Sequence, residues 1–456
     1  MKLTAINPAT GEIVREIHAD NDAVLEDKLH AAENAFSQWR KTSFSERASL
    51  LKTVASDMRE RVEKLAPLMT EEMGKPIREA RAEVEKAAWC AEHYAEHAEA
   101  YLAPQTLPSD AAHSYVQHLP LGAVMGVLPW NAPFWLAFRF CAPALMAGNT
   151  CLMKHDPHVP GCAEAIANLF VRAGASEGVF QALLLETERV ERVLRDTRLK
   201  AVSFTGSSRG GAAVASIAAS EIKPAVLELG GSDPSIVLAD ADLKKAAEVL
   251  KISRIINAGQ SCIAAKRLIV EAPVYDAMLS LLTEKFAALK LGDPALDETD
   301  VGPIARKDLQ TELHRQVQAT VDKGARLVMG GALPDGPGYF YPVTLLADVE
   351  PGMCAFEEET FGPVGVVIRA RDADHALQLA NDTEYGLAAS IWSTAERGEA
   401  LAREIEAGQV AVNGIVKTDP RLPSGGIKKS GYGRELGPHG IHEFVNAQQV
   451  WVGPSV

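Results

Sequence analysis

The chain has 456 residues, of which 47% are hydrophobic, and its 46 basic and 60 acidic side chains give a formal charge of −14. This length predicts two or three domains. The acidic balance disfavours a non-specific nucleic-acid or anionic-membrane surface, and no apolar run is long and unbroken enough for a membrane span or a secretory signal. Six cysteines without a CxxC pair indicate neither a disulfide scaffold nor a zinc site, so we expect a cytoplasmic protein.

The first part of the chain predicts helices followed by alternating elements. Residues 23–100 favour two or three amphipathic helices, because apolar residues recur there at helical spacing. The stretch SYVQHLPLGAVMGVL then predicts a strand, a Pro-Leu-Gly turn and a second strand, a hairpin able to pair with another chain. From residue 122 the strands GAVMGVL, TCLMK, GVFQALLL and AVSFTG alternate with helices. Short links between them predict right-handed crossovers and a doubly wound parallel sheet.

A second alternating series follows the stretch ELGGSDP. It contains the strands SIVLAD, RLIVEA and ARLVMGG and the helices between them, so it predicts a second α/β domain. The pair Gly230–Gly231 lies at the change from one series to the next, where paired glycines can take up dihedral changes that other residues resist. We therefore expect a hinge at this position.

Three side chains are candidates for chemistry. Cys262 lies in NAGQSCIAAKR, and taken alone such a cysteine is most often a small buried hydrophobe. Glu228 in LELGGSDP precedes the Gly-Gly turn, at the expected base of a cleft between the two domains. Asn131 in VLPWNAPFW follows a strand at the end where open parallel sheets bind ligands. Its amide could donate to an oxyanion together with the backbone N–H of Cys262, although an Asn in a turn is usually a capping residue.

The stretch SFTGSSRGG adds a glycine-rich turn between a strand and a helix, with Gly206 and Ser207 at its start. Backbone N–H groups at a helix start suit a pyrophosphate, but the spacing is not GxGxxG and the signal by itself is weak.

Together these stretches resemble the aldehyde dehydrogenase superfamily. The motifs PWNAPFW, FTGS, LELGGSDP, NAGQSC, EEETFGPV, NDTEYGLAASIW and PSGGIKKSGYGRE occur in the family's order and at its approximate spacings over nearly the whole chain. The resemblance implies an α/β fold of two doubly wound parallel-sheet domains plus a small β oligomerisation element. It divides the chain into a dinucleotide-binding domain (1–100 and 120–230), a catalytic domain (231–430) and an oligomerisation element (101–119 and 431–456) that makes homodimers or homotetramers.

The resemblance also implies a reaction. The Cys262 thiolate attacks an aldehyde, and Asn131 and the Cys262 N–H hold the oxyanion of the resulting thiohemiacetal. Collapse of this adduct passes hydride to NAD or NADP and leaves a thioester, which a water activated by Glu228 hydrolyses to a carboxylic acid. Family members that transfer the acyl group to coenzyme A lack a glutamate at this motif position, so water is the expected acceptor.

Cofactor contacts carry over residue by residue. The resemblance implies Lys154 at the adenosine ribose, Gly206 and Ser207 at the pyrophosphate, Leu128 and Trp130 beside the dinucleotide, and Glu359 and Phe361 at the nicotinamide ribose. NAD-preferring members often have a glutamate where this chain has Pro157 in KHDP. Loss of that carboxylate admits a 2′-phosphate, while Asp156 could partly replace it, so the choice between NAD and NADP stays open.

The expected substrate is a small aldehyde with a distal carboxylate. Arg139 lies eight residues beyond Asn131, about two helical turns, and shares its face. Without the resemblance it would read as a solvated helix arginine. Succinate-semialdehyde dehydrogenases have an arginine at this position, which binds the far carboxylate, and often a second one where this chain has Ile256. Four residues are candidates to replace the second arginine: Arg254, Lys266, Lys417 and Arg421.

Other interpretations are weaker. The histidines at 155, 158, 439 and 442 are irregularly spaced, so no metal site is expected, and Cys141 and Cys354 are assigned to packing. A different small aliphatic aldehyde or semialdehyde is the alternative substrate. A non-catalytic NAD(P)-binding scaffold, of the kind that lens crystallins show for this family, is the alternative of another class, and the intact Cys262 and Glu228 argue against it.

Overall fold

The computed structural model describes residues 2–453, so residue 1 of the predicted dinucleotide-binding segment and residues 454–456 of the predicted oligomerisation element lie outside it. Its first sheet has the strand order β19-β9-β8-β5-β6-β7. The strands are β5 (Ala123–Leu128), β6 (Thr150–His155), β7 (Phe180–Ala182), β8 (Leu199–Thr205), β9 (Ala225–Glu228) and β19 (Gly431–Tyr432). All pairs are parallel except β19 with β9. The predicted doubly wound sheet is therefore confirmed, with its switch point between β8 and β5.

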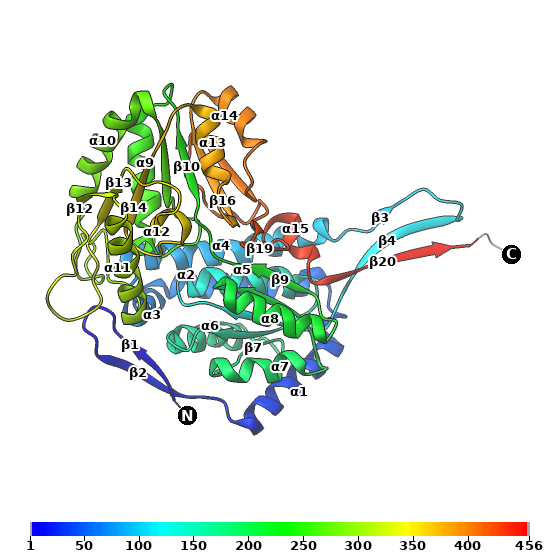
Figure 1. Ribbon diagram of the computed structural model, residues 1–456. Coiled ribbons are helices and arrows are strands. Elements are labelled where there is room, and N and C mark those ends of the chain that lie inside the picture. Colours follow the sequence, from blue (N-terminus) through cyan, green and yellow to red (C-terminus); the bar gives the residue numbers. More distant parts are fainter. Residues whose placement is uncertain (1, 454–456) are drawn as a thin grey trace.

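Helices cover both faces of this sheet (Figure 1). They are α1 (Asp22–Trp39), α2 (Phe44–Glu60), α3 (Val62–Met73), α4 (Ile77–Tyr101), α5 (Pro133–Met146), α6 (Pro160–Arg172), α7 (Val190–Arg195) and α8 (Ser208–Ser220). Successive residues of β5 enter different cores: Val124 and Leu128 pack with the cluster around α2 to α6, whereas Met125 and Val127 pack with α1, α7 and α8. A strand buried on both faces reads as a continuous apolar run, as GAVMGVL does.

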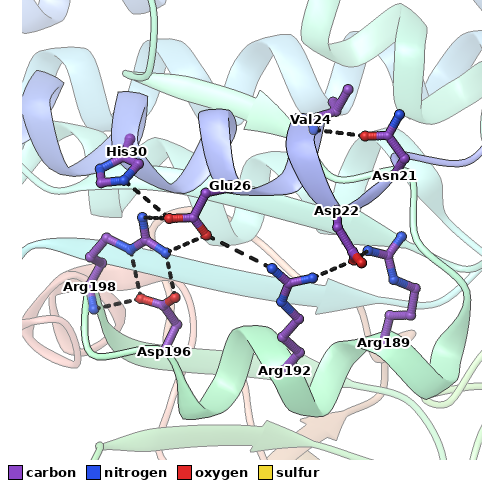
Figure 2. Close-up of polar contacts among 9 residues, drawn as sticks. All are labelled: Asn21, Asp22, Val24, Glu26, His30, Arg189, Arg192, Asp196 and Arg198. Atoms are coloured by element: carbon purple, nitrogen blue, oxygen red, sulfur yellow. Dashed lines mark hydrogen bonds and ion pairs between the residues drawn. The ribbon is translucent and has the colours of Figure 1, made fainter.

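An ion-pair network joins α1 to α7 at the surface (Figure 2). Asp22 contacts Arg189 at 2.5 Å and also Arg192, and Glu26 contacts Arg198 at 2.8 Å. Exposed pairs of this kind each contribute about 0–1 kcal/mol. The apolar contacts beneath α1 therefore hold it more strongly than this network does.

The second sheet has the order β12-β13-β14-β11-β10-β16-β17. Its strands are β10 (Pro234–Val237), β11 (Arg267–Glu271), β12 (Arg326–Met329), β13 (Thr344–Ala347), β14 (Val364–Ala370), β16 (Ala388–Trp392) and β17 (Gln409–Val412), and only β12 is antiparallel to its neighbour. Around it lie α9 (Leu243–Ile255), α10 (Tyr275–Ala287), α11 (Lys307–Asp322), α12 (Cys354–Glu357), α13 (Ala373–Asn381) and α14 (Ala395–Ala402). Residues 236 and 237 of β10 pack into two different hydrophobic clusters, one on each face of the sheet. The predicted second α/β unit is therefore present.

A third sheet, which we call the arm, corrects the predicted hairpin. It contains β3 (Gln105–Thr106), β4 (His113–Pro120) and β20 (Val445–Val452), and it projects to one side of the molecule (Figure 1). The strand β4 does not turn back onto β5: it pairs antiparallel with β20, from Val445 opposite Pro120 to Val452 opposite His113. The hairpin was wrong because β5 is buried along its whole length and needs parallel partners on both sides, whereas β4 is only half-buried.

Short elements complete the described chain. Strands β1 (Lys2–Ile6) and β2 (Ile13–His18) pair with each other, β15 (Tyr385–Gly386) pairs with β18 (Ile427–Lys428), and α15 (Gly437–His442) precedes β20. Within residues 2–453, the structure contains no helix whose length and apolar character would suit a membrane crossing.

Candidate active site

Several predicted cofactor residues meet at one edge of the first sheet. Leu128 ends β5, Lys154 lies at the same end of β6, and Gly206 follows β8. Because β8, β5 and β6 are adjacent and parallel, their carboxyl ends form one continuous edge, next to the switch point where open sheets bind ligands. The structure thus brings together residues that lie far apart in the sequence.

The helix α8 begins at this edge. Ser207 is its N-cap, and the serine hydroxyl oxygen accepts a hydrogen bond from the N–H of Gly210 at 3.2 Å. The remaining N–H groups of the first turn have no partner within the helix. A helix start of this kind attracts the phosphate oxygens of a ligand.

Lys154 provides a second feature that fits a dinucleotide. It is buried, and its ammonium group forms no ion pair within residues 2–453. Burial lowers its pKa, while Asp156 raises it. The Asp156 carboxylate lies 2.6 Å from the ring nitrogen Nδ1 of His158. A buried lysine that lacks a protein partner can donate hydrogen bonds to ribose hydroxyls or to a phosphate.

One of the predicted nicotinamide residues, Phe361, contacts Trp130, which lies two residues beyond the end of β5. The rings of Trp130 and Phe361 contact edge-to-face, with centroids 5.9 Å apart. Glu359 accepts a hydrogen bond from the N–H of Gly231 at 3.2 Å and lies 3.2 Å from the ammonium group of Lys266. Glu359 therefore links the predicted hinge to the segment that carries Cys262.

The segment before Cys262 has an unusual backbone. Asn257, Ala258 and Gly259 have φ of 53°, 53° and 75°, the left-handed region that costs energy for residues other than glycine. Gln260 holds the segment in place, since its amide donates to the carbonyl of Asn257 and accepts from the N–H of Ala305 at 2.9 Å. Strained backbone that is fixed on several sides is frequent at functional sites.

Cys262 itself is half-buried and has no disulfide partner. Burial raises the pKa of its thiol to about 12, although the nearby charges of Lys266 and Arg139 act to lower it. Lys266 is placed there by its hydrogen bond to the Cys262 carbonyl, at 2.6 Å. The thiol is therefore protonated at neutral pH, and a nucleophilic role requires a base to remove the proton.

Asn131 lies next to this segment. Its side-chain amide donates to the carbonyl of Gln260 at 3.2 Å, two residues before Cys262. Its backbone carbonyl accepts from Lys75 at 2.8 Å and from Asn257 at 2.9 Å. Lys75 in turn pairs with buried Glu83, which accepts hydrogen bonds from the first N–H groups of α5. Two contacts thus fix the backbone of Asn131, and one fixes its side-chain amide, two residues from the cysteine.

Glu228 and Arg139 are in contact. Arg139 lies 3.4 Å from Glu228 and 2.5 Å from Glu435, and all three side chains are buried. Burial raises the pKa of Glu228 to about 7, against the lowering effect of Arg139. One oxygen of Glu228, Oε1, is buried without a hydrogen-bond partner. A carboxyl with this pKa can take and return protons at neutral pH.

The arrangement combines a thiol, an amide donor, a buried carboxyl and a phosphate-binding helix start, and comparison with known proteins explains the combination. The sequence profile described as "Aldehyde dehydrogenase family" matches residues 1–450. The chain belongs to the aldehyde dehydrogenase family.

Two relatives and one solved structure similar to this aldehyde dehydrogenase have related names. The chain is 48% identical over 453 residues to a "Probable succinate-semialdehyde dehydrogenase [NADP(+)]" of a Synechocystis species, with 99% of this chain and 100% of the relative covered. It is 45% identical over 448 residues to "Succinate semialdehyde dehydrogenase [NAD(P)+] Sad" of Escherichia coli, with coverage of 98% and 97%. The crystal structure of succinic semialdehyde dehydrogenase from Streptococcus pyogenes, in complex with NADP+, superimposes with a TM-score of 0.97 at 36% identity, with coverage of 99% and 100%. The predicted aldehyde dehydrogenase fold is confirmed.

The four candidates for a second carboxylate-binding cation do not lie free in the site of this aldehyde dehydrogenase. Arg254 donates to the carbonyls of residues 259 and 265, and Lys266 to those of 261 and 262. Arg421 pairs with Asp419 at 2.6 Å, and Lys417 is exposed. Arg254 and Lys266 are therefore engaged by backbone carbonyls and Arg421 by a carboxylate, while Lys417 lies at the surface.

Three buried residues around the site were not predicted from the sequence: Glu435, Lys75 and Glu83. Glu435 belongs to the quoted motif SGYGRE, so the resemblance offered a signal that was not used. The pair Lys75 and Glu83 had no such signal, because two charges eight residues apart on a predicted surface helix usually face solvent.

Proposed function

We propose that this aldehyde dehydrogenase oxidises succinate semialdehyde to succinate with NADP or NAD. The observation that carries the proposal is the buried guanidinium of Arg139, which lies beside the proposed base Glu228 and close enough to Cys262 to influence the pKa of its thiol. A guanidinium in this position can donate charge-assisted hydrogen bonds to the far carboxylate of a short semialdehyde. The names of the relatives support the same substrate.

The first half of the reaction forms a covalent adduct. Glu228, with a pKa of about 7, accepts the proton of the Cys262 thiol, either directly or through water, and the sulfur attacks the aldehyde carbon. A C–S bond forms, and the carbonyl π electrons become an oxyanion. The side-chain amide of Asn131 and the backbone N–H of Cys262 donate hydrogen bonds to that oxygen. The buried site strengthens both bonds because water does not compete for the donors.

Bound NADP or NAD supplies the hydride acceptor for the oxidation. The groups described at the sheet edge would hold it: Ser207 and the α8 start at the pyrophosphate, Lys154 at the adenosine ribose, and Trp130, Glu359 and Phe361 towards the nicotinamide. Leu128 and Gly206 would border its path along the edge. Pro157 leaves no carboxylate against a 2′-phosphate, and Asp156 is held by His158, so both coenzymes are expected to bind, NADP included.

The second half of the reaction releases the acid. Once Glu228 has released the first proton to solvent, it removes a proton from water, and the resulting hydroxide attacks the thioester carbon. The C–S bond breaks, and the proton held by Glu228 passes to the departing sulfur to return the thiol. The presence of a buried glutamate with a pKa of about 7 favours water as the acyl acceptor rather than coenzyme A.

Steady-state kinetics test this proposal. We would measure kcat/KM for succinate semialdehyde, glutarate semialdehyde and butanal, each with NAD and with NADP. We expect the highest value for succinate semialdehyde, with the difference from butanal residing mainly in KM. Equal values for butanal and succinate semialdehyde would refute the substrate assignment while leaving the oxidation chemistry intact.

The predicted domain division, assembly and location remain parts of the proposal. The three sheets support the division into a dinucleotide-binding domain, a catalytic domain and the arm, although β19 of the proposed oligomerisation element pairs with β9. The arm exposes Trp451 and Val452, a surface suited to a second copy of the chain in a homodimer or homotetramer. Six free cysteines support a reducing compartment, and we propose the cytoplasm.

A further inference from the structure

The side chain of Lys86, on α4, carries a charge that no carboxylate of residues 2–453 contacts directly, although Glu83 and Asp419 are near enough to act on its pKa. Its ammonium group donates a hydrogen bond to the hydroxyl of Thr418 at 2.8 Å and lies 4.1 Å from the centroid of the Trp135 ring. It makes no ion pair with any carboxylate of residues 2–453. Burial, together with the nearby charge of Arg139, lowers the pKa of Lys86 to about 8, against the raising effects of Glu83, Cys90 and Asp419. A half-buried cation in this state is costly unless an anion binds to it.

Its neighbours place Lys86 at the active site. Trp135, whose ring it covers, lies four residues before Arg139 on α5, so both side chains leave the same face of that helix. Thr418 belongs to the loop of residues 413–426. The same loop reaches Glu228 at its other end, since a Cβ on Gly425 would lie 2.6 Å from Oε1 of Glu228. Lys86 and the proposed base therefore border the same loop.

The charges around Arg139 show why a second cation is needed there. Arg139 contacts two buried carboxylates, Glu228 and Glu435. When both are ionised, the three groups sum to one negative charge, and when Glu228 is protonated they sum to zero. A substrate carboxylate that approached Arg139 alone would meet no net positive charge. It gains attraction only if another cation faces the same space.

We propose that Lys86 supplies this charge, so that Lys86 and Arg139 together bind the distal carboxylate of the substrate. Lys86 takes the place of the second arginine, whose position is occupied by Ile256, an exposed apolar residue in this chain. The Thr418 hydroxyl and the face of the Trp135 ring hold the ammonium group in place. The inference rests on the proposed function and makes Lys86 a specificity-determining residue.

The test uses Lys86→Met, Lys86→Arg and the control Lys417→Met, an exposed lysine beside Thr418. We would measure kcat and KM for succinate semialdehyde and for butanal, together with Tm. For Lys86→Met we expect KM for succinate semialdehyde to rise about 10- to 100-fold, the loss of one charge-assisted contact, with little change in kcat and none with butanal. Lys86→Arg should recover most of the binding, and Lys417→Met should resemble the parent enzyme.

Stability separates a binding role from a structural one. No carboxylate of the described chain forms an ion pair with Lys86, so Lys86→Met should leave Tm unchanged or raise it. A lower Tm with equal losses on both aldehydes would overturn the inference, as would an unchanged KM for succinate semialdehyde. If the parent enzyme itself failed to prefer succinate semialdehyde over butanal, the proposed function would fail instead, whatever the variants did.

Discussion

The contact between Arg139 and Glu228 leads to a measurable effect on the pH dependence of the enzyme. Arg139→Gln removes a cation that lies 3.4 Å from the proposed base. At an effective dielectric constant of about 20, a pair of charges at this distance interacts with about 5 kcal/mol. Water entering the vacated space reduces this value, so we expect the pKa of Glu228 to rise by about one to two units, at about 1.4 kcal/mol per unit.

The assay is the pH profile of kcat/KM with butanal, which avoids any contact between Arg139 and a substrate carboxylate and reports groups of the free enzyme. In the parent enzyme the rate should rise with pH around 7, where Glu228 ionises. In Arg139→Gln this limb should move upward, so that the rate at pH 7 falls about 5- to 50-fold and recovers at higher pH. Arg139→Lys keeps the charge and is the matched control.

Stability should follow the same ionisation. A carboxyl whose pKa is raised by folding contributes stability that is fully present below its unfolded pKa and is lost as the pH rises through its folded pKa. For Glu228 that window runs from 4.5 to about 7. In Arg139→Gln it extends to higher pH, so Tm should fall more steeply between pH 7 and 9 than in the parent. A limb that stays near pH 7, with rates lowered equally at all pH values, would refute the electrostatic role of Arg139.

Three other variants test the supports of the site and the fold. Asn131→Ala should lower kcat about 100- to 1000-fold, as loss of one oxyanion donor does, and a kinetic effect confined to KM would contradict this. Lys75→Met leaves Glu83 buried without its cation and should cost about 3–5 kcal/mol in urea unfolding, whereas a loss below about 1 kcal/mol would show that the pair is dispensable. In Gly178→Ala, a φ of 87° is combined with a Cβ only 2.1 Å from a carbonyl oxygen of α1. The control is Gly174→Ala, where φ is 80° and the space around the Cβ is open, so Gly178→Ala should lower Tm clearly more than Gly174→Ala does. Equal losses of Tm would mean that α1 shifts freely.

Local sequence patterns predicted the parts of the fold that depend on local order. Strands that alternate with helices through short links favour right-handed crossovers and therefore parallel sheets. Both large sheets that this pattern predicts are present. The partner of β4 was not predictable in this way. It is β20, at residues 445–452, and nothing in the alternation around residue 120 carries information about a strand so far along the chain.

The site shows the same division between local and distant information. Glu228 ends β9 and Asn131 follows β5, so the predicted topology placed these two residues at strand ends, whereas the expectation for Cys262 came from the resemblance. Arg139 was expected to point towards a substrate, and its contact with Glu228 and Glu435 was not foreseen. Which charges neutralise one another depends on packing between segments far apart in the sequence, and helical periodicity carries no information about such packing.

The half-buried position of the Cys262 thiol also affects how fast the free enzyme reacts with oxidants and alkylating reagents. Peroxides and alkylating reagents react with the thiolate, and a pKa of about 12 leaves only a very small thiolate fraction at neutral pH. The resting protein should therefore resist oxidative inactivation, and its sulfur should become vulnerable only when an aldehyde or coenzyme has altered its surroundings.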